Sequence, residues 1–155
     1  MGYQVTEEDL RQMAWRTIVG GGHINWDETG GREEYALFVT ETMSGFFEDN
    51  GIEFVDMAPS NGLVNSGYCL ADTGDEYIIY LPSGGAVNLD LTAESGNFNT
   101  RWYNPRSGDY AGNSSIQGGA KRSLSAPDSK DWVLYVYSST PTPSCGDGSC
   151  NGSET

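Results

Sequence analysis

Few residues of this 155-residue chain have side chains suited to catalysis, and their spacing does not favour it. The chain has one histidine, His23, and no serine or cysteine nucleophile stands convincingly beside it. Hydrolysis of a glycosidic bond needs two carboxyl groups about 5–10 Å apart, held by rigid elements on opposite sides of the bond. Asp27 and Glu28 are adjacent and lie in an expected loop, so they are a poor pair for this chemistry. We therefore predict that this chain is not an enzyme and contains no catalytic residue.

The same residue types predict neither a metal site nor a cofactor site. A zinc site needs about four ligands, and the three cysteines and one histidine are too few and too scattered to supply them. The acidic residues are also scattered, apart from two short runs at 7–9 and 33–34, so no calcium-binding loop is visible. We expect no cofactor.

The charge of the chain limits its partners. Eight basic residues against 22 acidic ones give a formal net charge of −14, which would repel nucleic acid and anionic membrane surfaces. The excess of acid either serves solubility alone or favours cations and basic partner surfaces. No segment approaches the roughly 20 apolar residues of a membrane span. We expect no nucleic acid and no membrane among the partners.

Aromatic residues are the best candidates for binding. In the alternating segment 98–103, Trp102 shares a face with Phe98, and we expect it, like Trp132, to lie in a core. Tyr103 points to the opposite face, beside an expected turn at 104–108, with Arg106 and Tyr110 close by in sequence. We predict that Tyr103, Arg106 and Tyr110 form a surface that binds a ligand; cross-strand pairing without function is the alternative.

Two helices are expected at the start of the chain. Thr6 and Asp9 fit a capping box for a helix over 6–19, with a buried stripe of Leu10, Met13, Ala14, Thr17 and Ile18. The glycines at 20–22 end this helix. Apolar residues recur at helical spacing again from about 32 to 48, and Asn50 and Gly51 stop that second helix.

From Gly67 onward the hydrophobic period changes from 3.6 to 2, which predicts strands. Segment 53–57 is expected to be extended. The further expected strands are 68–71, 76–81, 87–92, 98–103, short pieces near 110, 115–117 and 122–125, and 132–137. Turn signals recur roughly every 8–12 residues, as in an antiparallel β-sandwich. The predicted fold is mainly β: a sandwich of about eight strands preceded by two α-helices.

The cysteines fall into two groups. Cys69 lies among apolar residues of a predicted strand, and we expect a buried, inert thiol. Cys145 and Cys150 follow a proline-rich linker, in a tail that is similar to the start of a cysteine-rich repeat of exported proteins. Their pairing, with each other or with cysteines elsewhere, stays open.

Several segments together resemble a known domain family. They are Gly67–Ala71, Glu76–Pro82, Val87–Leu91, Arg101–Gly108 and Lys130–Leu134, in order across roughly residues 50–138. The family is described as "putative collagen-binding domain of a collagenase". In it, a β-sandwich follows a (β/α)₈ barrel similar to apiosidase-type glycoside hydrolases. The resemblance implies that residues 1–49 are the last helices of such a barrel, 50–139 the sandwich, and 140–155 a linker with the start of a cysteine-rich module.

The resemblance also implies a function. We expect a non-catalytic accessory domain of a secreted, carbohydrate-active protein that binds an extracellular polymer, either polysaccharide or collagen, with its export signal upstream. The alternatives are a purely structural domain that stabilises the barrel, or part of a glycoside hydrolase whose catalytic residues lie elsewhere. His23 either packs locally or lines the sugar site of a complete barrel. Without that barrel, we expect Leu10, Met13, Phe38 and Met43 to form an exposed apolar patch.

Overall fold

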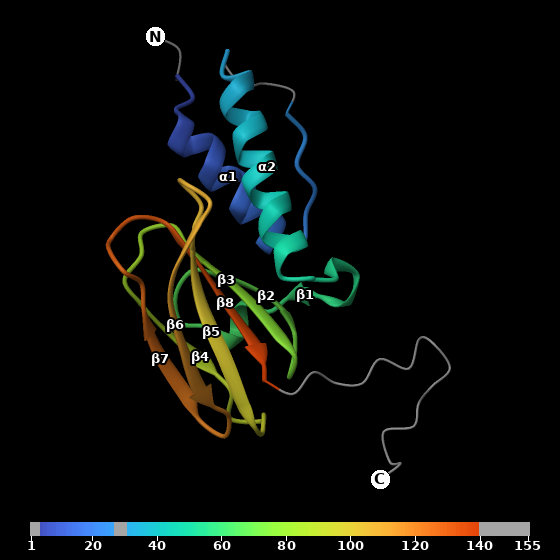
Figure 1. Ribbon diagram of the computed structural model, residues 1–155, viewed down its shortest axis with the longest axis vertical. Coiled ribbons are helices and arrows are strands. Elements are labelled where there is room, and N and C mark those ends of the chain that lie inside the picture. The colour runs from blue at the N-terminus through green and yellow to red at the C-terminus, as the bar shows by residue number, and fades with distance from the viewer. Residues whose placement is uncertain (1–3, 27–30, 140–155) are drawn as a thin grey trace.

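The computed structural model describes residues 4–26 and 31–139, and it places two helices over one end of a β-sandwich (Figure 1). Helix α1 spans Glu7–Val19 and helix α2 spans Glu33–Asp49, as the sequence predicts. The capping box is also confirmed, because the Thr6 side chain accepts from the Asp9 backbone and the Asp9 side chain accepts from the Thr6 backbone. Residues 27–30 and 140–155 lie outside the described part, so the expectations for Asp27, Glu28, Cys145 and Cys150 do too.

The predicted antiparallel β-sandwich is confirmed, with eight strands in two sheets within the described part of the chain. The larger, sheet A, has the order β1-β2-β3-β8-β5-β6, and the smaller, sheet B, pairs β4 with β7. The strand bounds are β1 Ala58–Pro59, β2 Tyr68–Asp72, β3 Glu76–Leu81, β4 Ala86–Asp90, β5 Asn97–Asn104, β6 Asp109–Gln117, β7 Lys121–Ser125 and β8 Trp132–Ser138. All neighbouring strands run antiparallel.

Two local expectations need correction. The segment expected to be extended, 53–57, contains a 3₁₀ turn over Phe54–Asp56. The short pieces expected near Tyr110 and 115–117 belong to one strand, β6, which is interrupted by an irregularity opposite Arg101 and Trp102. Gly112 has φ +61° there, a backbone conformation that glycine adopts without the cost of a Cβ. The bulge therefore takes up one extra residue, and the strand continues on both sides of it.

The first core fills the space between sheets A and B. Both tryptophans predicted for it are buried there, with ring centroids 6.4 Å apart in an edge-to-face contact. Cys69 is buried in the same core, and this burial raises the pKa of its thiol to about 12. The thiol therefore stays neutral near physiological pH, which agrees with the predicted inert cysteine.

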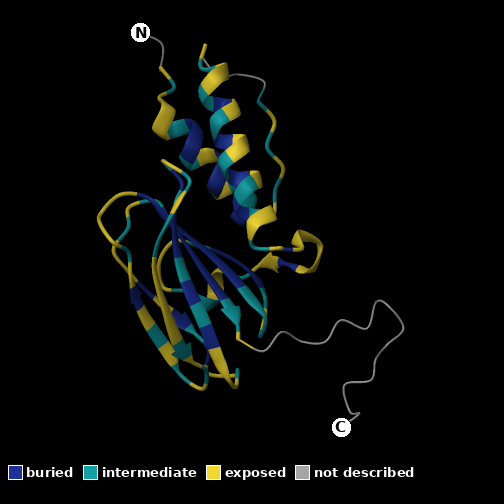
Figure 2. Cartoon of the chain, in the orientation of Figure 1, coloured by how far each residue is buried: buried dark blue, intermediate teal, exposed yellow. Residues whose placement is uncertain are grey.

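The second core lies between sheet A and the two helices, so the central strands of sheet A are buried on both faces (Figure 2). Trp15 of α1 packs against Tyr80 of β3, with centroids 6.1 Å apart. Phe46 of α2 packs against Tyr103 of β5 at 4.9 Å and against Tyr135 of β8 at 5.8 Å. The molecule thus has three layers: the helices, sheet A and sheet B.

The stripe predicted for α1 is only partly correct. Leu10 and Ala14 are buried, but Trp15 and Val19 are buried with them, Thr17 and Ile18 are half-buried, and Met13 is 45% exposed. The buried face is turned toward Trp15 because that ring fills the space between Tyr80 and Phe46.

The expected exposed patch is correspondingly wrong for Leu10 and Met43, which are both buried, Met43 in the second core. Phe38 is half-buried and packs against the second core. Large apolar side chains do remain exposed, namely Met13, Leu37, Phe54 and Val55.

The second core predicts a contrast between two positions on α2. Phe46→Ala removes a buried ring in contact with both layers, and we expect the free energy of unfolding to fall by about 3–5 kcal/mol. Leu37→Ala on the same helix, where the side chain is 58% exposed, should change it by less than about 0.5 kcal/mol. Urea denaturation followed by tryptophan fluorescence measures both. Equal effects would contradict the position of the core.

Candidate functional site

The structure brings the three predicted binding residues to one region, the junction between sheet A and the helices. Tyr103 does face away from Trp102, as predicted, but α2 covers that face and leaves only 3% of Tyr103 exposed. Its hydroxyl donates to the carbonyl oxygen of Thr42 at 2.7 Å, and burial raises its pKa to about 12. The alternation of side chains along β5 correctly placed Trp102 and Tyr103 on opposite faces of the sheet. It could not show that α2 covers the face that carries Tyr103.

Tyr110 extends this junction toward the solvent. Its ring lies 5.0 Å from that of Tyr103, and its hydroxyl accepts a hydrogen bond of 2.7 Å from the Asn50 side chain. The guanidinium of Arg101 lies over the Tyr110 ring, 4.1 Å from its centroid. Half-buried in this way, Tyr110 joins the C-terminal end of α2 to β5 and β6.

Arg106 occupies the turn between β5 and β6 and reaches across to the start of β8. Its backbone donates to the Asn104 side chain at 3.0 Å, which shapes the turn. Its guanidinium lies 5.0 Å from the ring of Trp132. The same group donates to the carboxylate of Asp131 at 3.1 Å and to the carbonyl oxygen of that residue.

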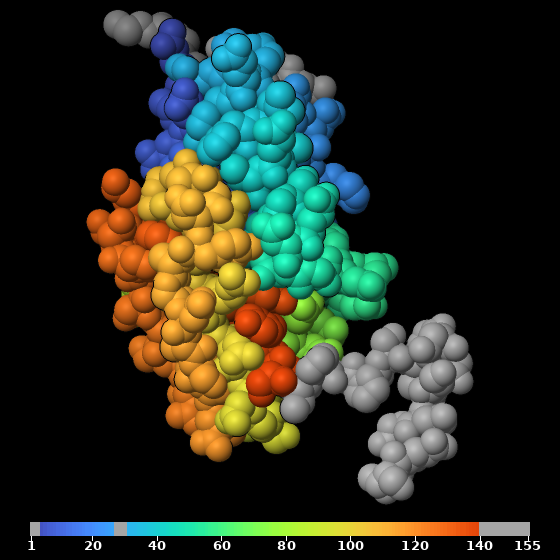
Figure 3. Space-filling view, in the orientation of Figure 1, coloured from blue at the N-terminus to red at the C-terminus, as the bar shows by residue number. Residues whose placement is uncertain are grey.

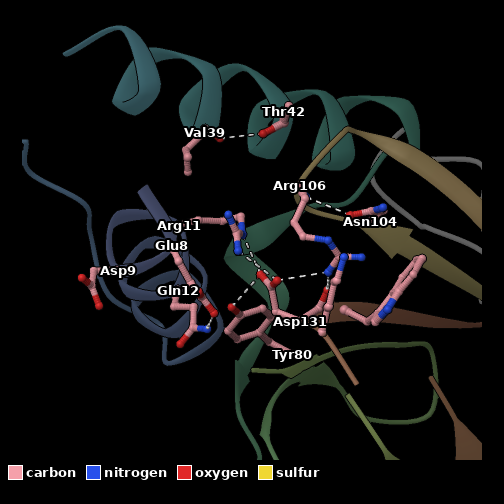
Figure 4. A network of polar contacts seen from close by, with 12 residues as sticks. Glu8, Asp9, Arg11, Gln12, Val39, Thr42, Tyr80, Asn104, Arg106 and Asp131 are labelled. Carbon is pink, nitrogen blue, oxygen red and sulfur yellow. Dashed lines mark hydrogen bonds and ion pairs between the residues drawn. The ribbon is translucent and has the colours of Figure 1, made fainter. Parts of the chain in front are cut away.

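Asp131 is the centre of a buried polar network, which sequence reasoning did not identify (Figure 4). Arg11 of α1 donates to both of its carboxylate oxygens, at 2.8 and 3.1 Å. The Tyr80 hydroxyl donates to the same carboxylate at 3.1 Å. We call Arg11, Tyr80, Arg106 and Asp131 the Asp131 cluster.

The cluster contains charged groups that are largely shielded from solvent. The side chains of Arg11 and Asp131 are 9% and 1% exposed. Burial disfavours the charge of Arg11, but its hydrogen bonds to Asp131 and Tyr35 outweigh this, so the pKa of the guanidinium is raised. Burial and the neighbouring carboxylate likewise raise the pKa of Tyr80, which keeps its hydroxyl a donor. The network therefore joins α1, β3, the β5–β6 turn and β8 by charge-assisted hydrogen bonds.

Comparison with protein families matches residues 58–137, more than half of the chain, to the "Putative collagen-binding domain of a collagenase". The chain belongs to this family. The match spans β1 to nearly the end of β8, so it covers the sandwich without the helices. The resemblance stated from sequence is thereby confirmed. No significant match is found among curated proteins.

Solved structures show that the fold of this family member recurs in glycoside hydrolases. One, titled "Glycoside hydrolase", superposes with a TM-score of 0.70 at 15% identity and covers 88% of this chain and 38% of its own. A glycoside hydrolase family 5 structure from Bacteroides vulgatus ATCC 8482 gives a TM-score of 0.67 at 18% identity, with 87% and 37% covered. Identities this low show the fold alone.

The share of this chain that superposes on the first glycoside hydrolase structure shows that the similarity extends into the helices. Residues 50–155 alone fall well short of 88% of the chain, so the shared fold must include much of residues 1–49. The chain also spans less than two-fifths of the length of either neighbour. Helices docked on a sandwich are thus an arrangement that larger glycoside hydrolases contain.

His23 lies in a mainly apolar hollow of about 420 Å³ at the edge of the helix layer. The other lining residues are Ile18, Gly22, Ile24, Trp26, Thr40, Met43, Ser44 and Phe54. Over residues 4–26 and 31–139, no group of three or more His, Cys, Asp and Glu side chains could hold a metal ion. Within the same ranges no helix is long and apolar enough to cross a membrane.

The Asp131 cluster predicts a large effect from a small substitution. Asp131→Asn keeps the shape of the side chain but leaves the buried charge of Arg11 unpaired, so we expect the free energy of unfolding to fall by about 3–5 kcal/mol. Asp90→Asn is the matched control, because Asp90 pairs with Lys121 at 3.7 Å on the surface and should change little. Chemical denaturation compares the two. A wild-type midpoint for Asp131→Asn would refute the role given to the cluster.

Proposed function

We propose that this chain is a non-catalytic accessory domain of a larger, secreted, carbohydrate-active protein, and that it binds an extracellular polymer. Membership of the collagenase-associated family supports a binding role, and the shared fold with two glycoside hydrolases supports a place beside a catalytic domain. Polysaccharide and collagen are both candidate polymers. The export signal and the upstream barrel would lie outside this chain.

One observation carries this proposal. The helices and the sandwich share the second core, and the Asp131 cluster joins them by hydrogen bonds beside it. If α1 and α2 are the last helices of the barrel, the sandwich cannot rotate freely against it. A polymer held by the sandwich would then stay at a fixed distance from the catalytic domain. Tethering of this kind raises the effective substrate concentration without any catalytic residue in the tether.

The purely structural alternative also has a specific observation in its favour. Apolar side chains remain exposed around the helix layer, including Leu37, Phe54 and Val55, and the hollow beside His23 is mainly apolar. A neighbouring domain could cover this surface, because isolated proteins rarely leave large apolar patches in water. Packing against a barrel and binding a polymer are compatible, since they use different faces.

The binding role of Tyr103, Arg106 and Tyr110 stays part of the proposal. Arg106 and Tyr110 keep partial exposure and can contact a ligand directly. Tyr103 can act only through Tyr110, because α2 covers it. Disulfide pairing of Cys145 and Cys150, with each other or with cysteines elsewhere, is likewise a proposal about the tail.

A single purified preparation separates the three functions. We expect no turnover of aryl glycosides above a buffer control, together with retention on insoluble polysaccharide or on fibrillar collagen in a pull-down assay. An unrelated acidic protein controls for non-specific retention. Turnover would show an enzyme, whereas retention on neither polymer would favour the purely structural role.

A further inference from the structure

The face of sheet A beneath the helices consists of successive cross-strand rows. Nearest the helices, Tyr80, Val133 and Tyr103 pair across β3, β8 and β5, and all three are buried. Four residues further from the helices along each strand, beyond a middle row of Ile78, Tyr135 and Arg101, the last row consists of Glu76, Tyr137 and Asn99, and all three are half-buried. We call these three residues the distal row. Helix α2 ends before it, so this end of the face is uncovered.

An open hollow of about 320 Å³ lies over the distal row. Its lining consists of Asn50, Asp75, Glu76, Asn99, Tyr135, Tyr137, Ser138 and Ser139. Figure 3 shows the red end of β8 at the surface there, between yellow β5 and green β3, below the end of α2. The volume lies at the lower end of the range of ligand pockets, about 300–1,000 Å³, and suits a small unit of a larger ligand.

Tyr135, two positions before Tyr137 on the same face of β8, holds the distal row in place. It is 3% exposed, and its ring stacks on that of Tyr137, with centroids 4.8 Å apart and planes at 21°. Its hydroxyl donates to one carboxylate oxygen of Glu76 at 2.5 Å. One buried residue thus orients both the aromatic ring and the acid that line the hollow, so little side-chain entropy remains to be lost on binding.

Glu76 and Asn99 of the distal row can still form hydrogen bonds with a ligand. Among the described residues, only Tyr135 donates to the Glu76 carboxylate, and none bonds the side-chain amide of Asn99. A carboxylate accepts several hydrogen bonds, and an amide both donates and accepts. Polar groups therefore stand on each side of the Tyr137 ring, on the neighbouring strands β3 and β5.

The electrostatics select the charge of the ligand. Burial, and then the neighbouring acids Asp75, Asp72 and Glu53, raise the pKa of Glu76. The chain as a whole carries a formal charge of −14. An anionic ligand would meet repulsion here, which leaves neutral and cationic ligands.

We propose that the distal row binds one sugar residue of a neutral glycan, with the Tyr137 ring against an apolar sugar face and with Glu76 and Asn99 bonding its hydroxyls. A sugar ring combines an apolar C–H face with adjacent hydroxyls that donate and accept, which matches a ring flanked by an acid and an amide. A basic peptide would use the acids but would leave the amide of Asn99 without a role. This inference rests on the proposed polymer-binding function and gives it a site.

Isothermal titration calorimetry on the full chain tests the proposal, with neutral hexaoses from cellulose, xylan and arabinan as probes. We expect at least one hexaose to bind, and Tyr137→Ala to weaken that affinity by at least about tenfold, a loss of about 1.4 kcal/mol. Asn99→Ala, which breaks no internal side-chain hydrogen bond, should weaken it in the same direction. Tyr68→Ala, a half-buried tyrosine at the opposite end of sheet A, is the matched control and should bind as wild type does.

Further arms separate this inference from the proposed function. A hexaose that binds Tyr137→Ala and Asn99→Ala unchanged overturns the distal row but leaves polymer binding intact. If no hexaose binds but the chain is retained on fibrillar collagen, the distal row is likewise overturned and polymer binding is left intact. Poly-lysine binding that Glu76→Gln abolishes identifies a cationic ligand and also overturns the proposal. No binding of any probe, and no retention on polysaccharide or collagen, contradicts the inference and the proposed function together.

Discussion

The buried carboxylate of Asp131 is the interaction on which the arrangement of the layers depends. A carboxylate that is 1% exposed would be very costly without partners, and here two guanidinium groups and a tyrosine hydroxyl provide them. An apolar interface tolerates small shifts, because its attraction has no direction. The cluster does not tolerate them, since a shift of α1 along sheet A would strand the charge of Arg11. We infer that the cluster contributes more to the position of the helices than to net stability.

This constraint divides sheet A into two regions with different roles. Beneath the helices, aromatic rings of the helix layer and of sheet A contact one another, and polar groups such as the Tyr103 hydroxyl bond to the helix backbone. Beyond the end of α2, the same strands present half-buried polar and aromatic side chains to solvent. A rigid junction next to an open sheet end is what a domain needs in order to hold a ligand at a fixed place beside a partner domain.

Local sequence patterns predicted most of the fold because strand and helix periodicities are local properties. The alternation around Val87 and Leu89 placed β4, and the capping box placed the start of α1. The pattern could not show that Trp15, rather than Met13, faces the sheet, because that depends on the rings of Phe46 and Tyr80, which are 31 and 65 positions away in the chain. The burial of Tyr103 was missed for the same reason, since alternation separates two faces without showing what covers them.

The Asp131 cluster lay furthest beyond sequence reasoning, because Arg11 and Asp131 are 120 positions apart. Native-state hydrogen exchange tests most directly whether this cluster makes the helices and the sandwich one cooperative unit. If it does, the slowest amides of α1 and α2 exchange with the same opening free energy as those of β3 and β8, and with the same urea dependence. Helix amides that open at much lower free energy than the sheet would contradict the account, because the helices would then detach while the sandwich stays folded.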